Sequence, residues 1–283
     1  MTLEMACREG TAILEGAGIV EGSLDAWLLL EYVTGVGRVD FLADREKPVE
    51  ESQAARYFEL IRQRAQRIPL QHLTGVQEFM GLEFQVNEQV LIPRQDTEIL
   101  VEKALSLLQG QEGAHVLDLC TGSGCILLSI LHYMIRSGWQ VLGTGADISA
   151  DAIEMARRNA EKLHLGADFI QSDLFSNIDG RYEMIVSNPP YIRTGEIGTL
   201  QDEVRLHDPR IALDGGADGL DFYRRIIKAC PAYLTRGGSL LVEIGCDQAE
   251  AVSGLMMRTG FHAVTVEKDL AGLDRVVYGV YDK

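Results

Sequence analysis

From residue 114 to the end of the chain, short apolar segments alternate with segments in which apolar residues recur every three or four positions. The first pattern is typical of buried strands and the second of helices. Strands that alternate with helices predict a mainly parallel sheet covered by helices on both faces. The last two strand-like segments, FHAVTV and RVVYGVY, are joined without a helix, and we expect them to pair antiparallel. The sequence thus predicts an α/β domain built on seven strands.

The first part of the chain has a different pattern. Residues 1–69 read as helices with short breaks, because apolar residues recur at helical spacing and Pro48 and Pro69 mark the start and end of a helix. Residues 70–92 change to a two-residue alternation about Met80 and Gly81, which predicts a β-hairpin. We therefore expect a helical substrate-docking domain over 1–69, a β-hairpin linker over 70–92 and the α/β domain over 93–283.

Composition argues against several classes of protein. Hydrophobic residues make up 46% of the 283 and charged residues 24%, as in ordinary globular proteins, and no apolar run is long enough to span a bilayer. The five cysteines are scattered without a C-x-x-C pair, and the N-terminus lacks a secretion signal. We expect a cytoplasmic protein with no membrane partner, no disulfide framework and no metal site.

The charge balance argues against nucleic acid as a direct partner. The 26 basic and 42 acidic residues give a net charge of −16, whereas phosphate binding needs a basic face. One local basic cluster lies in the helical region, at Arg56, Arg62, Arg64 and Arg67. Such a cluster is usually a solvated helix face, and the alternative hypothesis is a docking surface for a protein substrate.

Polar or glycine-rich residues follow four successive strands of the α/β region. They are Cys120, Thr121, Gly122, Ser123 and Gly124 after the first strand, Asp147 after the second, Asp173 and Leu174 after the third, and Asn188 after the fourth. A glycine turn before a helix lets the backbone approach a ligand, and Asp147 is placed to accept hydrogen bonds from ribose hydroxyls. Asp173 can accept from an adenine amino group, with Leu174 or Phe175 over the ring. Each residue could be structural on its own, but the four strand ends together predict one crevice.

The fourth strand end carries the tetrapeptide Asn188–Pro189–Pro190–Tyr191. The strand must stop at Asn188, because two successive prolines cannot donate to a sheet ladder. The prolines stiffen the backbone, so that the Asn188 amide, the Pro189 carbonyl and the Tyr191 ring are presented together. Two acceptors and an aromatic face suit a planar –NH2 group. The alternative is a proline-stiffened surface turn, which the preceding strand and the flanking Asn188 and Tyr191 disfavour.

These features resemble the Rossmann-like, seven-stranded domain of S-adenosylmethionine-dependent methyltransferases. The segment DLCTGSG and the tetrapeptide NPPY carry the likeness, and NPPY narrows it to enzymes that methylate a planar amide or amino nitrogen. Nearly the whole chain is similar to the protein-(glutamine) methyltransferase family that modifies peptide chain release factors, the HemK/PrmC type. The segments LIPRQDTEILVEKAL (91–105) and DEVRLHDPRIALDGGADGL (202–220) separate this family from adenine methyltransferases.

The resemblance implies S-adenosylmethionine as cofactor, with S-adenosylhomocysteine as product, bound by the turn from Cys120 to Gly124, by Asp147, by Asp173 and Leu174, and by Asn188. It implies that Asn188, Pro189, Pro190 and Tyr191 hold the glutamine of the release factor Gly-Gly-Gln motif, with Asn188, Pro189 and Tyr191 in the catalytic role. Three departures stand out: Cys120 where many members have glycine, Leu174 where some have tryptophan, and Gln95 in place of a proline.

Three other functions use part of the same pattern. An N(6)-adenine methyltransferase of DNA or RNA would hold an exocyclic amino group at the same tetrapeptide, Asn188–Tyr191, which we call the bracket. The acidic charge and the lack of a basic recognition domain count against this function. A glutamine methyltransferase of a ribosomal protein would differ only in its substrate. A cofactor-binding scaffold without catalysis is disfavoured by the intact Asn188 and Tyr191. The long, polar, aperiodic segment 192–218 favours a functional loop beside the site in each case.

Overall fold

The structure is a computed structural model that describes residues 1–282. It contains two compact units. Unit 1 consists of Met1–Val76 together with Gln201–His207, and unit 2 consists of Gln77–Leu200 and the chain from Asp208 onward. Unit 1 therefore includes a short piece of the loop that follows the NPPY tetrapeptide. In the described part of the chain, no helix is long and apolar enough to cross a membrane, and no cluster of His, Cys, Asp and Glu is placed to hold a metal ion.

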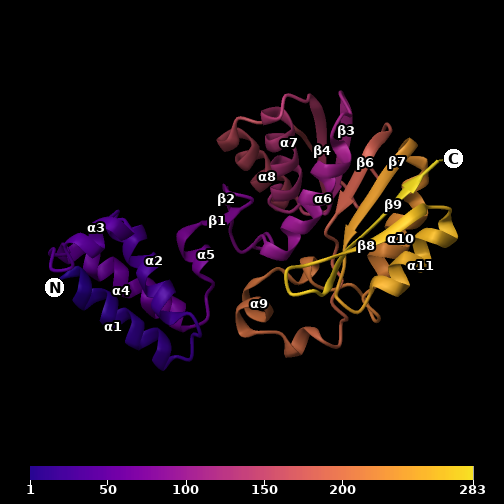
Figure 1. Cartoon of the computed structure of the whole chain (residues 1–283). Helices are drawn as coiled ribbons and strands as arrows, with labels where there is room; N and C mark the ends of the chain where they lie inside the picture. The colour runs from indigo at the N-terminus through magenta and orange to yellow at the C-terminus, as the bar shows by residue number, and fades with distance from the viewer. Residues whose placement is uncertain (283) are drawn as a thin grey trace. The chain divides into compact units, whose positions relative to one another are not determined.

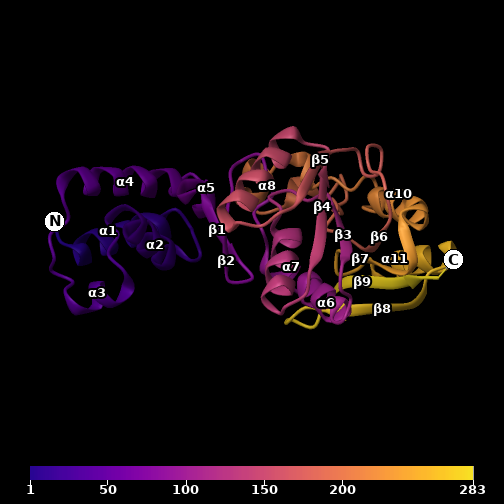
Figure 2. The same ribbon diagram turned by 90° about the horizontal axis from the view of Figure 1, so that it is seen from above.

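Unit 1 is helical. Its helices are α1 (Leu3–Gly16), α2 (Gly22–Thr34), α3 (Arg38–Ala43), α4 (Glu51–Ala65), α5 (Leu70–Thr74) and α9 (Asp202–His207). Helices α1, α2 and α4 lie side by side (Figure 2). They bury leucines and Tyr57 in one hydrophobic core. The Thr2 hydroxyl caps α1, and Glu50 and Gln53 form a capping box at the start of α4.

Half of the predicted basic cluster is internal to unit 1. Arg64 is only 8% exposed; its Nε donates to Asp25 Oδ2 at 2.7 Å and its Nη1 to Glu203 Oε1 at 3.2 Å. Arg67 Nη1 donates to the same Glu203 oxygen at 3.3 Å. These two arginines therefore hold α9 within the unit; Arg67 is partly exposed, and Arg56 and Arg62 are exposed to solvent.

Unit 2 contains the α/β domain and all of the β-hairpin except its first residue, Val76. Strands β1 (Val76–Phe79) and β2 (Leu82–Gln85) form the predicted hairpin. Its turn residues Met80 and Gly81 have φ of 53° and 68°, and tight two-residue hairpins require such positive values. The predicted hairpin is confirmed, but it occupies only residues 76–85 of the 70–92 segment, and Leu70–Thr74 forms helix α5 instead.

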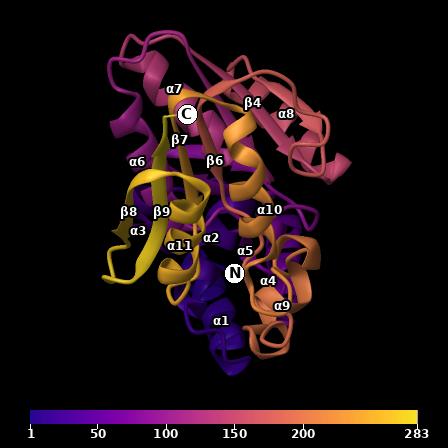
Figure 3. The ribbon, with the colours of Figure 1, turned by 90° about the vertical axis from the view of Figure 1, so that its right-hand side faces the viewer.

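The predicted seven-stranded sheet is also confirmed, with the strand order β5-β4-β3-β6-β7-β9-β8. The strands are β3 (Ala114–Leu119), β4 (Val141–Asp147), β5 (Asp168–Gln171), β6 (Tyr182–Ser187), β7 (Leu234–Glu243), β8 (His262–Lys268) and β9 (Asp274–Tyr281). Strand β9 runs antiparallel to β7 and β8, whereas the remaining pairs are parallel (Figure 3). The closing antiparallel pair is therefore β8 with β9, as expected from their direct connection.

Helices cover both faces of this sheet. Helices α6 (Glu98–Leu108), α7 (Cys125–Arg136) and α8 (Ala150–Leu163) pack on one face, and α10 (Asp221–Ala229) and α11 (Ala249–Thr259) pack on the other (Figure 1). Side chains that alternate along β3 serve the two faces, since Val116 joins the first core and Leu117 the second. Short 3-10 turns lie at η1 (Gln95–Thr97), η2 (Ile197–Thr199), η3 (Arg210–Ala212) and η4 (Cys230–Ala232).

Candidate functional site

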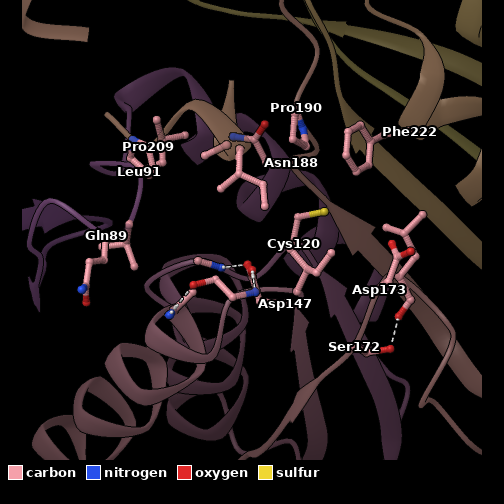
Figure 4. Close-up of a pocket in the computed structure, with 18 of the residues that line it drawn as sticks. Gln89, Leu91, Cys120, Asp147, Ser172, Asp173, Asn188, Pro190, Pro209 and Phe222 are labelled. Atoms are coloured by element: carbon pink, nitrogen blue, oxygen red, sulfur yellow. Dashed lines mark hydrogen bonds between the residues drawn. The ribbon is translucent and has the colours of Figure 1, made fainter. Parts of the chain in front are cut away.

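One cavity in unit 2 collects residues from the four predicted strand ends. Strands β5, β4, β3 and β6 are parallel neighbours, so the residues that follow them meet at one edge of the sheet. Figure 4 shows Cys120, Asp147, Asp173 and Asn188 around this cavity. Of the remaining residues predicted for the cofactor, Gly122 and Leu174 also line it, whereas Thr121 and Ser123 line a smaller cavity that shares Asn188, and Gly124 lies behind them at the start of α7.

The turn after β3 has an unusual backbone. Cys120, Gly122 and Gly124 have φ of 59°, 55° and 80°, all in the left-handed region. This conformation costs a cysteine roughly 1 to 2 kcal/mol, whereas glycine adopts it readily. A Cβ at Gly122 would meet no atom within 4 Å, so the backbone at this residue faces open space. The turn can therefore accept a ligand group in direct contact with its main chain.

Asp147 is held as an acceptor at the edge of this turn. Its Oδ2 accepts from the Gly122 N–H at 3.0 Å and its Oδ1 from the Ser149 N–H at 2.9 Å (Figure 4). Burial raises the pKa of Asp147, while these backbone donors act in the opposite direction. The cap of α8 is Ser149, whose hydroxyl accepts from the Ala152 N–H at 3.3 Å. Asp147 therefore is not the side-chain cap of this helix, and its spare lone pairs are available to hydroxyl donors.

The residues after β5 behave differently from one another. Asp173 Oδ1 accepts from Arg225 Nη2 at 2.6 Å in an exposed ion pair, so part of its acceptor capacity is taken. Leu174 is buried with a φ of 51°. Phe175 stacks on Tyr233 with ring centroids 4.5 Å apart and is not part of the cavity lining.

Sequence reasoning missed Phe222 and Ile148, two apolar residues that line the cavity. Phe222 lies on α10 and reaches the cavity, on the same side as Asp173, only through the tertiary fold (Figure 4). Ile148 follows Asp147 directly and is 49% exposed. The sequence indicated only one of these two apolar lining residues, because Ile148 directly follows an acid at a strand end.

Two residues of the tetrapeptide after β6 line the cavity, and the other two do not. Asn188 and Pro190 line the cavity (Figure 4), whereas Pro189 and Tyr191 lie outside its lining. Asn188 Nδ2 donates to Thr97 Oγ1 at 3.3 Å. The Tyr191 hydroxyl donates to Glu243 Oε1 at 3.3 Å, and burial raises the pKa of Tyr191, which keeps the phenol protonated. In this structure the Asn188 amide thus faces the cavity edge, and the Tyr191 hydroxyl points to the end of β7.

Comparison with known proteins decides the family. A protein-family model described as the PrmC N-terminal domain matches residues 5–75, and a second one, described as the methyltransferase small domain, matches residues 95–204. The chain is 44% identical to a release factor glutamine methyltransferase of Geobacter sulfurreducens, over 93% of this chain and 90% of that protein. It is 43% identical to the protein of the same description in Agrobacterium fabrum, over 93% and 92%. The chain belongs to the release factor glutamine methyltransferase family.

The membership predicted from the sequence is therefore confirmed. A methyltransferase from Pyrococcus furiosus superposes on 72% of this chain and 90% of its own, with a TM-score of 0.52 and 15% identity. At this low identity the similarity to the Pyrococcus furiosus structure is one of fold alone, and it confirms the Rossmann-like methyltransferase architecture.

In this member of the family, hydrogen bonds hold the later part of the polar segment 192–218 against the residue that follows the bracket. The Ile192 N–H donates to the Leu213 carbonyl at 3.0 Å, and the Gly215 N–H donates to the Ile192 carbonyl at 2.8 Å. The buried carboxylate of Asp208 accepts from Arg94 Nη2 at 2.6 Å. Other charged residues of the segment also form ion pairs, namely Glu203 with Arg64 and Arg67, Arg205 with Asp202, and Arg210 with Asp214. These pairs favour a positioning role for the segment over direct chemistry.

Replacing Gly215 by alanine is expected to lower kcat by about 100-fold with the fold intact, the size of effect produced by misplacing a reacting group by about 1 Å. A Cβ at Gly215 would lie 2.7 Å from Tyr191 Cα and 2.8 Å from the Pro190 carbonyl oxygen, so the bracket backbone must shift. Gly198 is the matched control, because a Cβ there meets nothing within 4 Å. Steady-state methylation assays on both variants check this, and equal rates would contradict it.

Proposed function

We propose that this protein transfers a methyl group from S-adenosylmethionine to the side-chain amide nitrogen of the glutamine in the Gly-Gly-Gln motif of peptide chain release factors. The modification supports translation termination in the cytoplasm. The observation that carries the proposal is the near full-length identity of 44% to a protein described as a release factor glutamine methyltransferase, combined with an asparagine-proline bracket at the rim of a cavity. Those relatives and the net charge of −16 disfavour adenine in a nucleic acid as the substrate.

The cavity fits the proposed cofactor chemically. It combines a bare glycine backbone at Gly122, an acceptor at Asp147 for ribose hydroxyls, and an apolar wall from Ile148, Leu174 and Phe222 for an adenine ring. S-adenosylmethionine supplies an electrophilic methyl group on a sulfonium sulfur. The residues of the turn, Asp147 and the Asp173–Leu174 region would hold it, with Asn188 at the border between cofactor and substrate.

The substrate amide needs activation, because its nitrogen lone pair is delocalised into the carbonyl. Asn188 Oδ1 and the Pro189 carbonyl would accept its two N–H groups and so localise electron density on nitrogen. Positioning and a desolvated, preorganised site would supply most of the acceleration. The methylated nitrogen would lose its extra proton to water, so no dedicated base is required. Tyr191 would support the amide plane.

Unit 1 would dock the protein substrate. Because Arg64 and Arg67 are engaged inside the unit, the exposed Arg56 and Arg62 of α4 are the members of the basic cluster that remain for an acidic partner. Charge reversal at Arg62 should then raise KM for the release factor while kcat stays unchanged. An unchanged KM would remove this surface from the proposal.

A labelling experiment tests the function. The protein is incubated with radiolabelled S-adenosylmethionine and, separately, with a release factor, the same release factor carrying Gly-Gly-Asn, ribosomal proteins and DNA. Label on the intact release factor alone, with one added methyl on the glutamine by mass spectrometry, is the expected result. Label on DNA alone would overturn the proposal, and label on a ribosomal protein alone would change the substrate.

A further inference from the structure

A buried carboxyl lies beside the bracket but has no part in the chemistry described so far. Glu243 is the last residue of β7 and is 2% exposed. Strand β7 pairs in parallel with β6, with Val242 opposite Ser187, so Glu243 follows in the position next to Asn188. A carboxyl at this depth is costly to bury unless it is hydrogen-bonded or paired with a charge.

Glu243 is connected to both ends of the bracket. Its Oε1 accepts from the Tyr191 hydroxyl at 3.3 Å. Its other oxygen, Oε2, is buried without a hydrogen-bond partner among the described residues, and the Thr97 hydroxyl lies beside the carboxyl on a residue that is itself 2% exposed. Thr97 Oγ1 in turn accepts from Asn188 Nδ2 at 3.3 Å. One carboxyl therefore reaches Tyr191 directly and Asn188 through a single threonine.

The chemistry of these groups fixes the direction of each hydrogen bond. An ionised carboxyl only accepts, and a threonine hydroxyl has one proton to give. Once Thr97 donates that proton to Glu243, its oxygen can only accept from Asn188. The amide –NH2 of Asn188 must then face Thr97, which turns Oδ1 away from Thr97 and leaves it free to accept.

We propose that Glu243 is a positioning residue that sets the orientation of the Asn188 amide through Thr97 and anchors Tyr191 directly. The inference rests on the proposed function in one respect, namely that Asn188 Oδ1 receives an N–H of the substrate amide. With the amide reversed, the site would present –NH2 to a substrate –NH2, and neither group could accept from the other.

The protonation of Glu243 should therefore control the rate. Burial raises the pKa of Glu243 to about 7, against the neighbouring Thr97 hydroxyl, the positive charge of Arg275 and the hydrogen bond from Tyr191. The titratable and charged groups around it are Tyr191, Tyr223, Cys125, Asp96 and Arg275. A protonated Glu243 can donate to Thr97 and release the constraint on Asn188. The value of kcat should accordingly fall as the pH is lowered through about 7.

The test uses Glu243→Gln, which keeps the shape of the side chain but offers one acceptor to two hydroxyls. Partners that orient a functional side chain typically contribute about 10- to 100-fold in activity, and we expect kcat to fall by that factor. The KM for the cofactor should stay unchanged, and the acid limb of the kcat profile near pH 7 should disappear. Thr97→Val should give a similar loss of kcat, Thr97→Ser should retain the rate, and the double variant Glu243→Gln/Thr97→Val should lose less than the product of the two single effects.

Several results would overturn the proposal. They are a wild-type kcat in Glu243→Gln, a parallel loss of cofactor affinity, strictly additive effects of the two substitutions, or an acid limb that persists in Glu243→Gln. A persisting limb would point to Asp118, whose pKa burial also raises to about 7.

A measurement without turnover separates this inference from the function. The side-chain amide resonance of Asn188, assigned by its loss in Asn188→Ala, should titrate near pH 7 in the wild type and not in Glu243→Gln. If the wild type methylates no release factor but this titration is seen, the function fails and the positioning role stands. If methylation occurs and the resonance does not titrate, the positioning role fails alone.

Discussion

Replacing Asn188 by alanine is expected to reduce kcat for glutamine methylation by at least about 100- to 1,000-fold, the usual loss when one preorganised polar contact to a reacting group is removed. Asn188 lines the cavity together with Pro190, and its Nδ2 donates to Thr97, which leaves Oδ1 free to accept. Affinity for S-adenosylhomocysteine should stay within a few-fold, because the glycine turn and Asp147 are untouched. Single-turnover assays and calorimetric titration measure the two quantities.

The matched control is Asn177→Ala. Asn177 is exposed, and its side chain donates only to the Gln171 carbonyl at 2.9 Å. This variant should keep the wild-type rate. Methyl transfer by Asn188→Ala at a rate near that of the wild type would exclude the bracket mechanism, whatever the control shows.

Replacing Arg64 by alanine is expected to destabilise unit 1 by about 3 to 5 kcal/mol, the usual cost of removing one partner from a buried ion pair. The substitution leaves Asp25 buried without its cation, and it removes one of the two arginines that hold Glu203. Equilibrium unfolding in urea measures the effect. Because the chain has two tryptophans, a Trp139→Phe background leaves the buried Trp27 in α2 as a fluorescence probe of unit 1 alone.

Arg62→Ala is the control for this experiment. Arg62 is exposed, and among the described residues its ion-pair partner is Glu59, one turn away on α4, so the unfolding midpoint should not move. Equal midpoints for Arg64→Ala and Arg62→Ala would show that the buried pair contributes nothing to the stability of unit 1.

The architecture followed from the sequence where periodicity and topology decide the outcome. Alternating strands and helices predicted the parallel sheet, and the direct link between FHAVTV and RVVYGVY predicted the antiparallel close. The same topology explains why Cys120, Asp147 and Asn188, which are distant in sequence, lie around one cavity. Strand ends are a property of the chain order, and a single sequence contains that information.

The directions in which the side chains point could not be predicted from periodicity and chain order. NPPY indicated a bracket, but nothing local shows that the Tyr191 hydroxyl turns to Glu243 or that Thr97 meets Asn188 across 91 residues. The run LLVEIG did contain a signal, since one acid inside an apolar strand end requires partners. Helix α9 is a similar case, because its six residues are held by arginines more than a hundred positions earlier and no local pattern marks them.

The membership of Gln201–His207 in unit 1 has a consequence for modularity. A unit assembled from two separated stretches of chain cannot be excised by cutting the chain at a single boundary. A fragment that ends at Val76 carries Asp25, Arg64 and Arg67 but lacks Glu203. Grafting the helical unit of another family member onto this α/β domain must therefore transplant the matching residues of the loop after NPPY as well. Recombination within the family is constrained to exchange the two stretches together.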